Sequence, residues 1–275
     1  MSRLAVVALL VSLFACVSRA TIPPNAQELN RTGAEAFAKG DYDTAVARLS
    51  VALEYQPRFV EAWVNLGLVE LARGDVDAAE RRFRHALAID VDAASAYLGL
   101  GLVMERRGDA AAAESSYRRA LAIDPGLPEP RANLARLLAA RGALDEARDQ
   151  LQRLVEIRAD EPAGWLALAE VLWRLDRPEQ ASQIVDEACD RLGARPETEL
   201  LLARRDLQGG ALVPAIDRLS ALSRVPGPVG RAALGWLAVA RCLAGDVAGA
   251  VASATSALGR DPDDALAKHV LATCR

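Results

Sequence analysis

The residues best suited to chemistry in this chain are aspartates that stand in pairs. Asp41 and Asp43, and again Asp75 and Asp77, are separated by one residue, and paired carboxylates can serve acid–base catalysis or calcium binding. Both pairs also lie where a helix is expected to begin, and an aspartate there accepts hydrogen bonds from free N–H groups of the first turn. Because the pairs recur in a repeated unit, we expect helix capping and no catalytic role.

Other patterns of catalytic or metal-binding residues are missing from the sequence. It contains no glycine-rich phosphate loop, H-E-x-x-H pair, nucleophile elbow or Ser/His/Asp signature. The two histidines, His85 and His269, lie far apart, and no Cys-x-x-Cys pair occurs, so the sequence predicts no metal site and no cofactor. We therefore expect a protein that is not an enzyme.

The four cysteines are Cys16, Cys189, Cys242 and Cys274. The last three are predicted to be small buried residues of helices. A disulfide between Cys242 and Cys274 is the alternative if the chain reaches an oxidising compartment.

The composition indicates a packed helical protein. Alanine, leucine and arginine are abundant in the 275 residues, while aromatic residues make up 4%, and this bias favours helix over sheet. The formal net charge is −4, without a contiguous basic tract. Nucleic-acid binding requires a positive face against phosphates, so it is not expected.

The first twenty residues have the pattern of an export signal. Arg3 precedes an apolar run of twelve residues from Leu4 to Ala15, which is too short to span a membrane. Cleavage before Thr21 would define residues 1–20 as a signal peptide, followed by a linker over 21–25. Alternatively, Leu13 to Cys16 resembles a bacterial lipobox, from which Phe14 departs, and the signal would end at residue 15 with a lipid on Cys16. Both alternatives predict an exported protein, either periplasmic or lipid-anchored to the outer membrane.

A period of 34 residues organises the rest of the chain. ARGDVDAAERRFRHALAID at 72–90 returns as RRGDAAAAESSYRRALAID at 106–124. Apolar residues three and four apart precede and follow each turn, which indicates a helix, a tight turn and a second helix in every unit. The turns recur at intervals of 34 residues, with one final interval of 35, at Gly40, Gly74, Gly108, Gly142, Asp176, Gly210 and Gly245.

Small residues recur in phase with these turns. The glycines accommodate the backbone that ends a first helix, and Asp75, Asp109 and Asp246 are predicted to cap the second helices. One place on the second helix holds alanine in every unit, which predicts a contact too close for a larger side chain: Ala45, Ala79, Ala113, Ala147, Ala181, Ala215 and Ala250.

These features resemble the tetratricopeptide repeat, whose pattern is W-x₂-L-G-x₂-Y, then A-x₃-F, then P. Trp63, Leu66 and Gly67 with Ala79 and Phe83 match it closely. A second match is formed by Tyr97, Leu100, Gly101, Ala113, Tyr117 and Pro125. The resemblance covers residues 26–275 and implies an all-α, right-handed α-solenoid of stacked helix-turn-helix repeats.

The phase of the pattern predicts seven repeats and a capping helix. The final piece would cover the last apolar face of the solenoid, as terminal repeats must. The predicted repeats are 26–59, 60–93, 94–127, 128–161, 162–195, 196–230 and 231–264, followed by the capping helix at 265–275.

The resemblance also implies where a partner would bind, because first helices line the concave groove in this family. In the family an asparagine at the place of Asn65 and Asn133 often bonds to a bound peptide backbone, and Trp173 and Trp236 could anchor a partner. The alternative is that these are polar surface residues and gap-filling tryptophans. By register, the groove would be lined by Arg31, Asn65, Leu68, Leu102, Asn133, Arg136, Glu170, Trp173, Arg204 and Trp236.

The function that this resemblance implies is a scaffold or assembly adaptor of the bacterial cell envelope that holds a partner peptide or helix in the groove. An accessory or regulatory subunit of an envelope enzyme, docked through another face, is the alternative. The clamp that some family members use for C-terminal carboxylates is not matched, since Asn30 and Ala34 stand where its first lysine and asparagine would be. The oligomeric state is left open.

Overall fold

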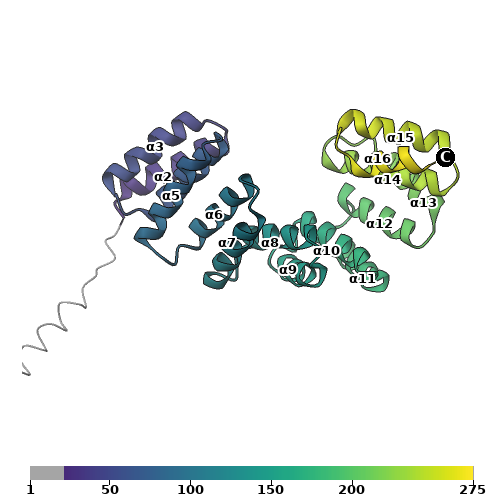
Figure 1. Ribbon diagram of the computed structural model, residues 1–275, viewed down its shortest axis with the longest axis horizontal. Coiled ribbons are helices and arrows are strands. Elements are labelled where there is room, and N and C mark those ends of the chain that lie inside the picture. Colours follow the sequence, from purple (N-terminus) through teal and green to yellow (C-terminus); the bar gives the residue numbers. More distant parts are fainter. Residues whose placement is uncertain (1–21, 275) are drawn as a thin grey trace, which may run out of the picture. The chain divides into compact units, whose positions relative to one another are not determined.

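A computed structural model describes residues 22–274 (Figure 1), and every regular element in that range is a helix. This confirms the all-α class and the stacked helix pairs. The predicted signal segment, Cys16 and Arg275 lie outside the described residues. The helices fall into two compact units, divided between Pro125 and Gly126.

Between residues 22 and 125, the first unit contains six helices, and each helix packs against the next. The first helices of successive pairs also touch, since α2 packs on α4 and α4 on α6. The bounds are α2 Pro24–Ala38, α3 Tyr42–Tyr55, α4 Val60–Ala72, α5 Val76–Ile89, α6 Ala94–Arg106 and α7 Ala110–Ile123.

The second unit contains nine helices, and its consecutive helices pack in the same way. Its first helices α10, α12 and α14 form a continuous row, and α16 packs on α14 and α15. The bounds are α8 Pro128–Ala140, α9 Leu144–Ile157, α10 Pro162–Arg174, α11 Pro178–Leu192, α12 Pro196–Gln208, α13 Leu212–Leu222, α14 Pro228–Leu243, α15 Val247–Arg260 and α16 Ala265–Thr273.

One predicted boundary is wrong. The linker was expected over residues 21–25, but α2 already begins at Pro24, after Pro23 as its N-cap residue. A proline suits the first helical position because its φ is already helical and its missing N–H has no intrahelical partner there. The pair Pro23–Pro24 therefore starts the helix and does not delay it.

The predicted caps are confirmed. The side chains of Asp75 and Asp109 accept hydrogen bonds from the backbone N–H groups of Ala78 and Ala112, at 2.8 and 3.0 Å. Asp246 bonds in the same way to Gly249 at 2.8 Å. These bonds satisfy N–H groups that a helix start leaves without partners.

The fifth turn carries the same backbone conformation without a glycine. Gly142 has φ +86° in its turn, and Asp176 has φ +56° at the equivalent place 34 residues later. An L-residue is disfavoured in this left-handed region by about 1–2 kcal/mol, whereas glycine is not.

Asp176→Gly is therefore expected to raise the free energy of unfolding by about 0.5 kcal/mol, because the relief of strain slightly exceeds the entropy that glycine adds to the unfolded chain. Urea denaturation measures the change. Gly142→Ala is the converse control and should lower stability by about 1 kcal/mol. A destabilised Asp176→Gly variant would show that the aspartate makes an additional stabilising contact.

The core lies between the two helix layers of each unit. The seven repeated alanines are all fully buried, as expected from the close approach of the helices. Large side chains fill the remaining space, and Phe83, Tyr117 and Trp165 are at most 2% exposed. Phe83 and Tyr117 belong to the repeat pattern described above, and Trp165 stands three periods of 34 residues after Trp63.

The C-terminal end is held by a covalent bond. Cys242 of α14 and Cys274, which follows α16, form a disulfide with a Cα–Cα distance of 5.8 Å. The expectation that both are simply buried helix residues was therefore wrong, because packing α16 on α14 brings the two thiols together. Cys189 is free and half-buried, and burial raises the pKa of its thiol.

Candidate functional site

Four of the residues predicted to line the groove meet in the second unit. Arg204 of α12 lies between Trp173 of α10 and Trp236 of α14, with its Cζ atom 4.5 Å and 3.4 Å from the respective ring centroids. Its Nη1 atom forms an ion pair of 2.8 Å with Glu170 of α10. We call this cluster the arginine–tryptophan stack. It connects three successive first helices, so it spans one face of the unit.

Arg204 is unusually buried for an arginine. The residue is 8% exposed, and its Nε atom has no hydrogen-bond partner. Burial lowers the pKa of the guanidinium from its ordinary value, and the Glu170 carboxylate opposes that change. The cation–π contacts with two indole rings compensate part of the lost hydration, since such contacts strengthen when they are desolvated. Arg204 therefore belongs to the packing between the three first helices.

The two tryptophans of the stack differ from those of the repeat pattern. The indole N–H groups of Trp63 and Trp165 donate to the carbonyls of Pro57 and Ala159, at 2.9 and 3.0 Å. Trp173 and Trp236 are half-buried, and their indole N–H groups donate to no other residue within 22–274. Each therefore presents an apolar ring and an unused donor, a combination that suits contact with another molecule.

A pocket of about 610 Å³ lies beside the stack, between α8 and α10. Its floor is formed by Leu151 and Leu154 of α9, which packs against both first helices. Both walls consist mainly of residues with little or no side chain. We call it the alanine pocket; its walls include Ala132, Ala135 and Ala139 on α8, and Ala163, Gly164 and Ala167 on α10.

The alanine pocket exists because α8 and α10 carry alanine at places where the next repeat carries larger residues. Trp173 stands 34 residues after Ala139, and Leu201 stands 34 residues after Ala167. Side chains of that size would occupy the space between α8 and α10. The volume matches that of pockets that hold small molecules or several side chains of a partner.

The charged residues of the pocket are divided between its two ends. At the N-terminal ends of the helices, Arg158 forms ion pairs with Glu129, at 3.3 Å, and with Glu161. At the C-terminal ends, Arg174 donates a 2.9 Å hydrogen bond to the carbonyl of Ala139. Arg136 of α8 also lines the pocket. The first end is compensated by two carboxylates, whereas Arg174 at the second end forms no ion pair with another residue among 22–274.

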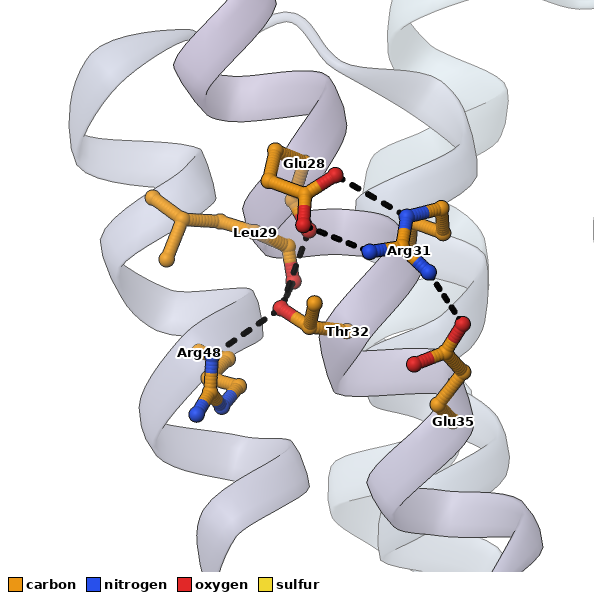
Figure 2. A network of polar contacts seen from close by, with 6 residues as sticks. All are labelled: Glu28, Leu29, Arg31, Thr32, Glu35 and Arg48. Atoms are coloured by element: carbon orange, nitrogen blue, oxygen red, sulfur yellow. Dashed lines mark hydrogen bonds and ion pairs between the residues drawn. The ribbon is translucent and has the colours of Figure 1, made fainter.

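In the first unit, Arg31 forms its ion pairs within its own helix, α2. Figure 2 shows its guanidinium between Glu28 and Glu35, with ion pairs to both, and Arg48 donating to Thr32. The hydrogen bond and charge of Glu28 raise the pKa of the Arg31 guanidinium. Two carboxylates thus balance this exposed arginine, which leaves it less able to bind an anion of a partner.

The remaining predicted groove residues divide into two kinds. Leu68 and Leu102 are partly buried against the core of the first unit, so they belong to the packing of the helices. Asn65 donates a 2.9 Å hydrogen bond to the side chain of Asn30, and one of its amide protons is therefore occupied. Asn133 is half-buried, and its side chain bonds to no other described residue.

The alanines of the pocket were not predicted as site residues. Reasoning from chemical groups selected polar and aromatic side chains, whereas this site is formed by the lack of side chains. A signal was nevertheless present, because Ala139 interrupts a series of larger residues at equivalent places of the repeat, and Ala167 is smaller than Asn133 and Leu201 in the two neighbouring repeats. Comparing the size of residues across repeats would have indicated it.

Within residues 22–274, no group of three or more His, Cys, Asp and Glu side chains is placed to hold a metal ion. None of the helices from α2 to α16 is both long enough and apolar enough to cross a bilayer.

Comparisons with known proteins agree with the helix pairs. Four sequence profiles described as tetratricopeptide repeat match the chain, at residues 58–126, 106–171, 162–187 and 200–265. No curated protein matches the sequence.

Solved structures of low sequence identity share the fold. Pseudomonas aeruginosa pilF is 20% identical with a TM-score of 0.63, over 74% of this chain and 94% of that one. PilW, described as a widely conserved type IV pilus biogenesis factor, is 21% identical with a TM-score of 0.61, over 73% and 93%. A tetratricopeptide repeat protein from Parabacteroides merdae is 14% identical with a TM-score of 0.65, over 91% and 98%. At these identities the likeness concerns the fold alone.

Proposed function

Because the chain belongs to the tetratricopeptide repeat family, we propose that it is a non-enzymatic scaffold whose second unit holds a peptide or helix of a partner protein. The observation that carries this proposal is the alanine pocket, an apolar space of about 610 Å³ between two first helices. Burial of apolar side chains there would favour binding, because apolar surface is removed from water. The chain would act as an assembly adaptor.

The arginine–tryptophan stack extends the proposed binding surface. Ala167 lines the pocket from α10, while Glu170 and Trp173 of the same helix belong to the stack. A partner segment that fills the pocket could therefore also contact Trp173 and Trp236. Tryptophan is enriched among residues that dominate binding energies, because a large ring loses little conformational entropy.

The proposed place of action is the bacterial envelope. Two features support it: the apolar segment from Leu4 to Ala15 behind Arg3, and the Cys242–Cys274 disulfide. Disulfides persist in oxidising compartments and are rare in the cytosol. The mass of the mature N-terminus tests the proposal in an expressing bacterium. A chain that starts at Thr21 would be periplasmic, a lipidated chain that starts at Cys16 would be membrane-anchored, and an uncleaved chain would contradict export.

The alternative is an accessory or regulatory subunit of an envelope enzyme that docks through another face. Capture of partners from envelope extracts by the tagged full-length chain distinguishes the two. Ala167→Leu fills the alanine pocket with the residue that Leu201 provides one repeat later. Ala111→Leu makes the same change on the exposed surface of α7 and is the matched control. Loss of the partner only with Ala167→Leu supports the groove, and equal capture by all three chains supports another face.

A further inference from the structure

We propose that the segment seated in the alanine pocket is acidic as well as apolar, with bulky side chains in the pocket and a carboxylate held by Arg174. This inference rests on the proposed function and specifies the chemistry of the partner at the same site. It is argued from the shape of the pocket and from the unequal charge of its two ends.

The shape of the pocket requires apolar side chains from the partner. Alanine and glycine form most of both walls, and leucines form the floor. Small walls let the backbone of a partner approach closely, and the volume must then be filled by large side chains of the partner. A polar segment would leave unpaired groups against this surface, at a cost comparable to a lost hydrogen bond for each group.

The direction of the pocket follows from contacts at its two ends. Glu129, near the start of α8, pairs with Arg158, which lies just before α10. Ala139, near the end of α8, accepts a hydrogen bond from Arg174, the last residue of α10. The two first helices therefore run side by side in the same direction, and the pocket has an N-terminal and a C-terminal end.

Only one of these ends has an uncompensated cation. Arg158 at the N-terminal end has two carboxylate partners. Arg174 at the C-terminal end forms no ion pair with any residue among 22–274, and its one hydrogen bond goes to a neutral carbonyl. A guanidinium has five N–H donors, so four remain for an anion. Its planar fork matches a carboxylate, which it can bind through two hydrogen bonds.

Selection from a phage-displayed library of random peptides on the immobilised full-length chain tests the inference. We expect enriched peptides to combine Leu, Ile, Phe or Met with Asp or Glu a few positions away. One enriched peptide is then synthesised together with its Glu→Gln or Asp→Asn form. Both are measured by fluorescence polarisation against the wild-type chain, Ala167→Leu and Arg174→Gln. Arg153→Gln is the charge-matched control, because Arg153 is exposed on α9 and lies outside the pocket lining.

Two results together would support the proposal. Ala167→Leu should abolish binding of the peptide. Arg174→Gln should weaken binding of the acidic peptide about tenfold. Binding of the amide form should not change, because only the carboxylate is stabilised by the guanidinium. Arg153→Gln should have no effect.

The outcomes separate this inference from the proposed function. Peptides that depend on Ala167 but carry no acidic residue, or that bind Arg174→Gln and wild type equally, would overturn the inference and leave the groove function standing. Enrichment of basic peptides would overturn it as well. A library from which no peptide is enriched would contradict both the inference and the peptide-binding function.

Discussion

Phe83→Ala is expected to lower the free energy of unfolding by about 4 kcal/mol, as for other fully buried aromatic residues. Phe83 of α5 is fully buried. Its ring lies against two glycines, Gly67 of its own first helix and Gly99 of the next one, where added Cβ atoms would be 2.7 and 2.3 Å from the ring. The side chain therefore joins two successive repeats, and its removal leaves a cavity between three helices. Guanidinium denaturation of the variant measures the loss.

A second substitution tests whether this contact acts as described. Gly99→Ala alone should lower the free energy of unfolding by about 1–3 kcal/mol, because the buried ring has no room to move away from a new methyl group. In the Phe83→Ala background the same methyl would enter the vacated space. The double variant should therefore be more stable than the sum of the single changes predicts.

Gly259→Ala is the control for Gly99→Ala, because an added Cβ at Gly259 meets no atom within 4 Å. It should stabilise the chain by about 0.5–1 kcal/mol through helix propensity alone. Additive effects of Phe83→Ala and Gly99→Ala would contradict the proposed contact between the ring and α6.

Reduction of the Cys242–Cys274 disulfide is expected to lower the stability of the second unit by about 4 kcal/mol, from the chain entropy of a closed loop of this length. The bond joins residues 32 positions apart. It also secures α16, a helix of nine residues that buries only Ala267 and Val270 within its own length. So short a helix is not stable by itself in water, and packing on so few small residues holds it weakly.

Denaturation with and without a phosphine reductant measures this effect, and hydrogen exchange locates it. Protection of the amides of α16 should be lost first. Cys189→Ser is the control, because Cys189 is free and should not change the response to reductant. Equal stability of the oxidised and reduced chains would show that α16 is held by packing alone.

The sequence alone was sufficient to predict the helix pairs and the turns within them. The period, the capping aspartates and the repeated alanines depend on interactions within one repeat, or on a contact that every repeat makes in the same way. Ala79, for example, occupies the same fully buried place as Ala45 and Ala113. A property that is copied in each unit can be read from the spacing of residues, because the geometry is identical each time.

The candidate site depends on differences between repeats, and these were decided by the tertiary structure. Arg204 meets Trp173 and Trp236 because three first helices lie in a row, and no local pattern shows which rings a long side chain will reach. Asn65 resembles Asn133 in register, yet only Asn65 finds a bonding partner in Asn30, on the neighbouring first helix α2.

The alanine pocket and the disulfide both depend on packing between helices that are not adjacent in the sequence. Ala139 and Ala167 are ordinary helix residues in the sequence, and they create a pocket only because α8 and α10 face each other across α9. Cys242 and Cys274 pair only because α16 packs on α14. Local spacing determines which face of a helix is apolar, whereas packing between helices determines which side chains on that face meet and where space is left unfilled.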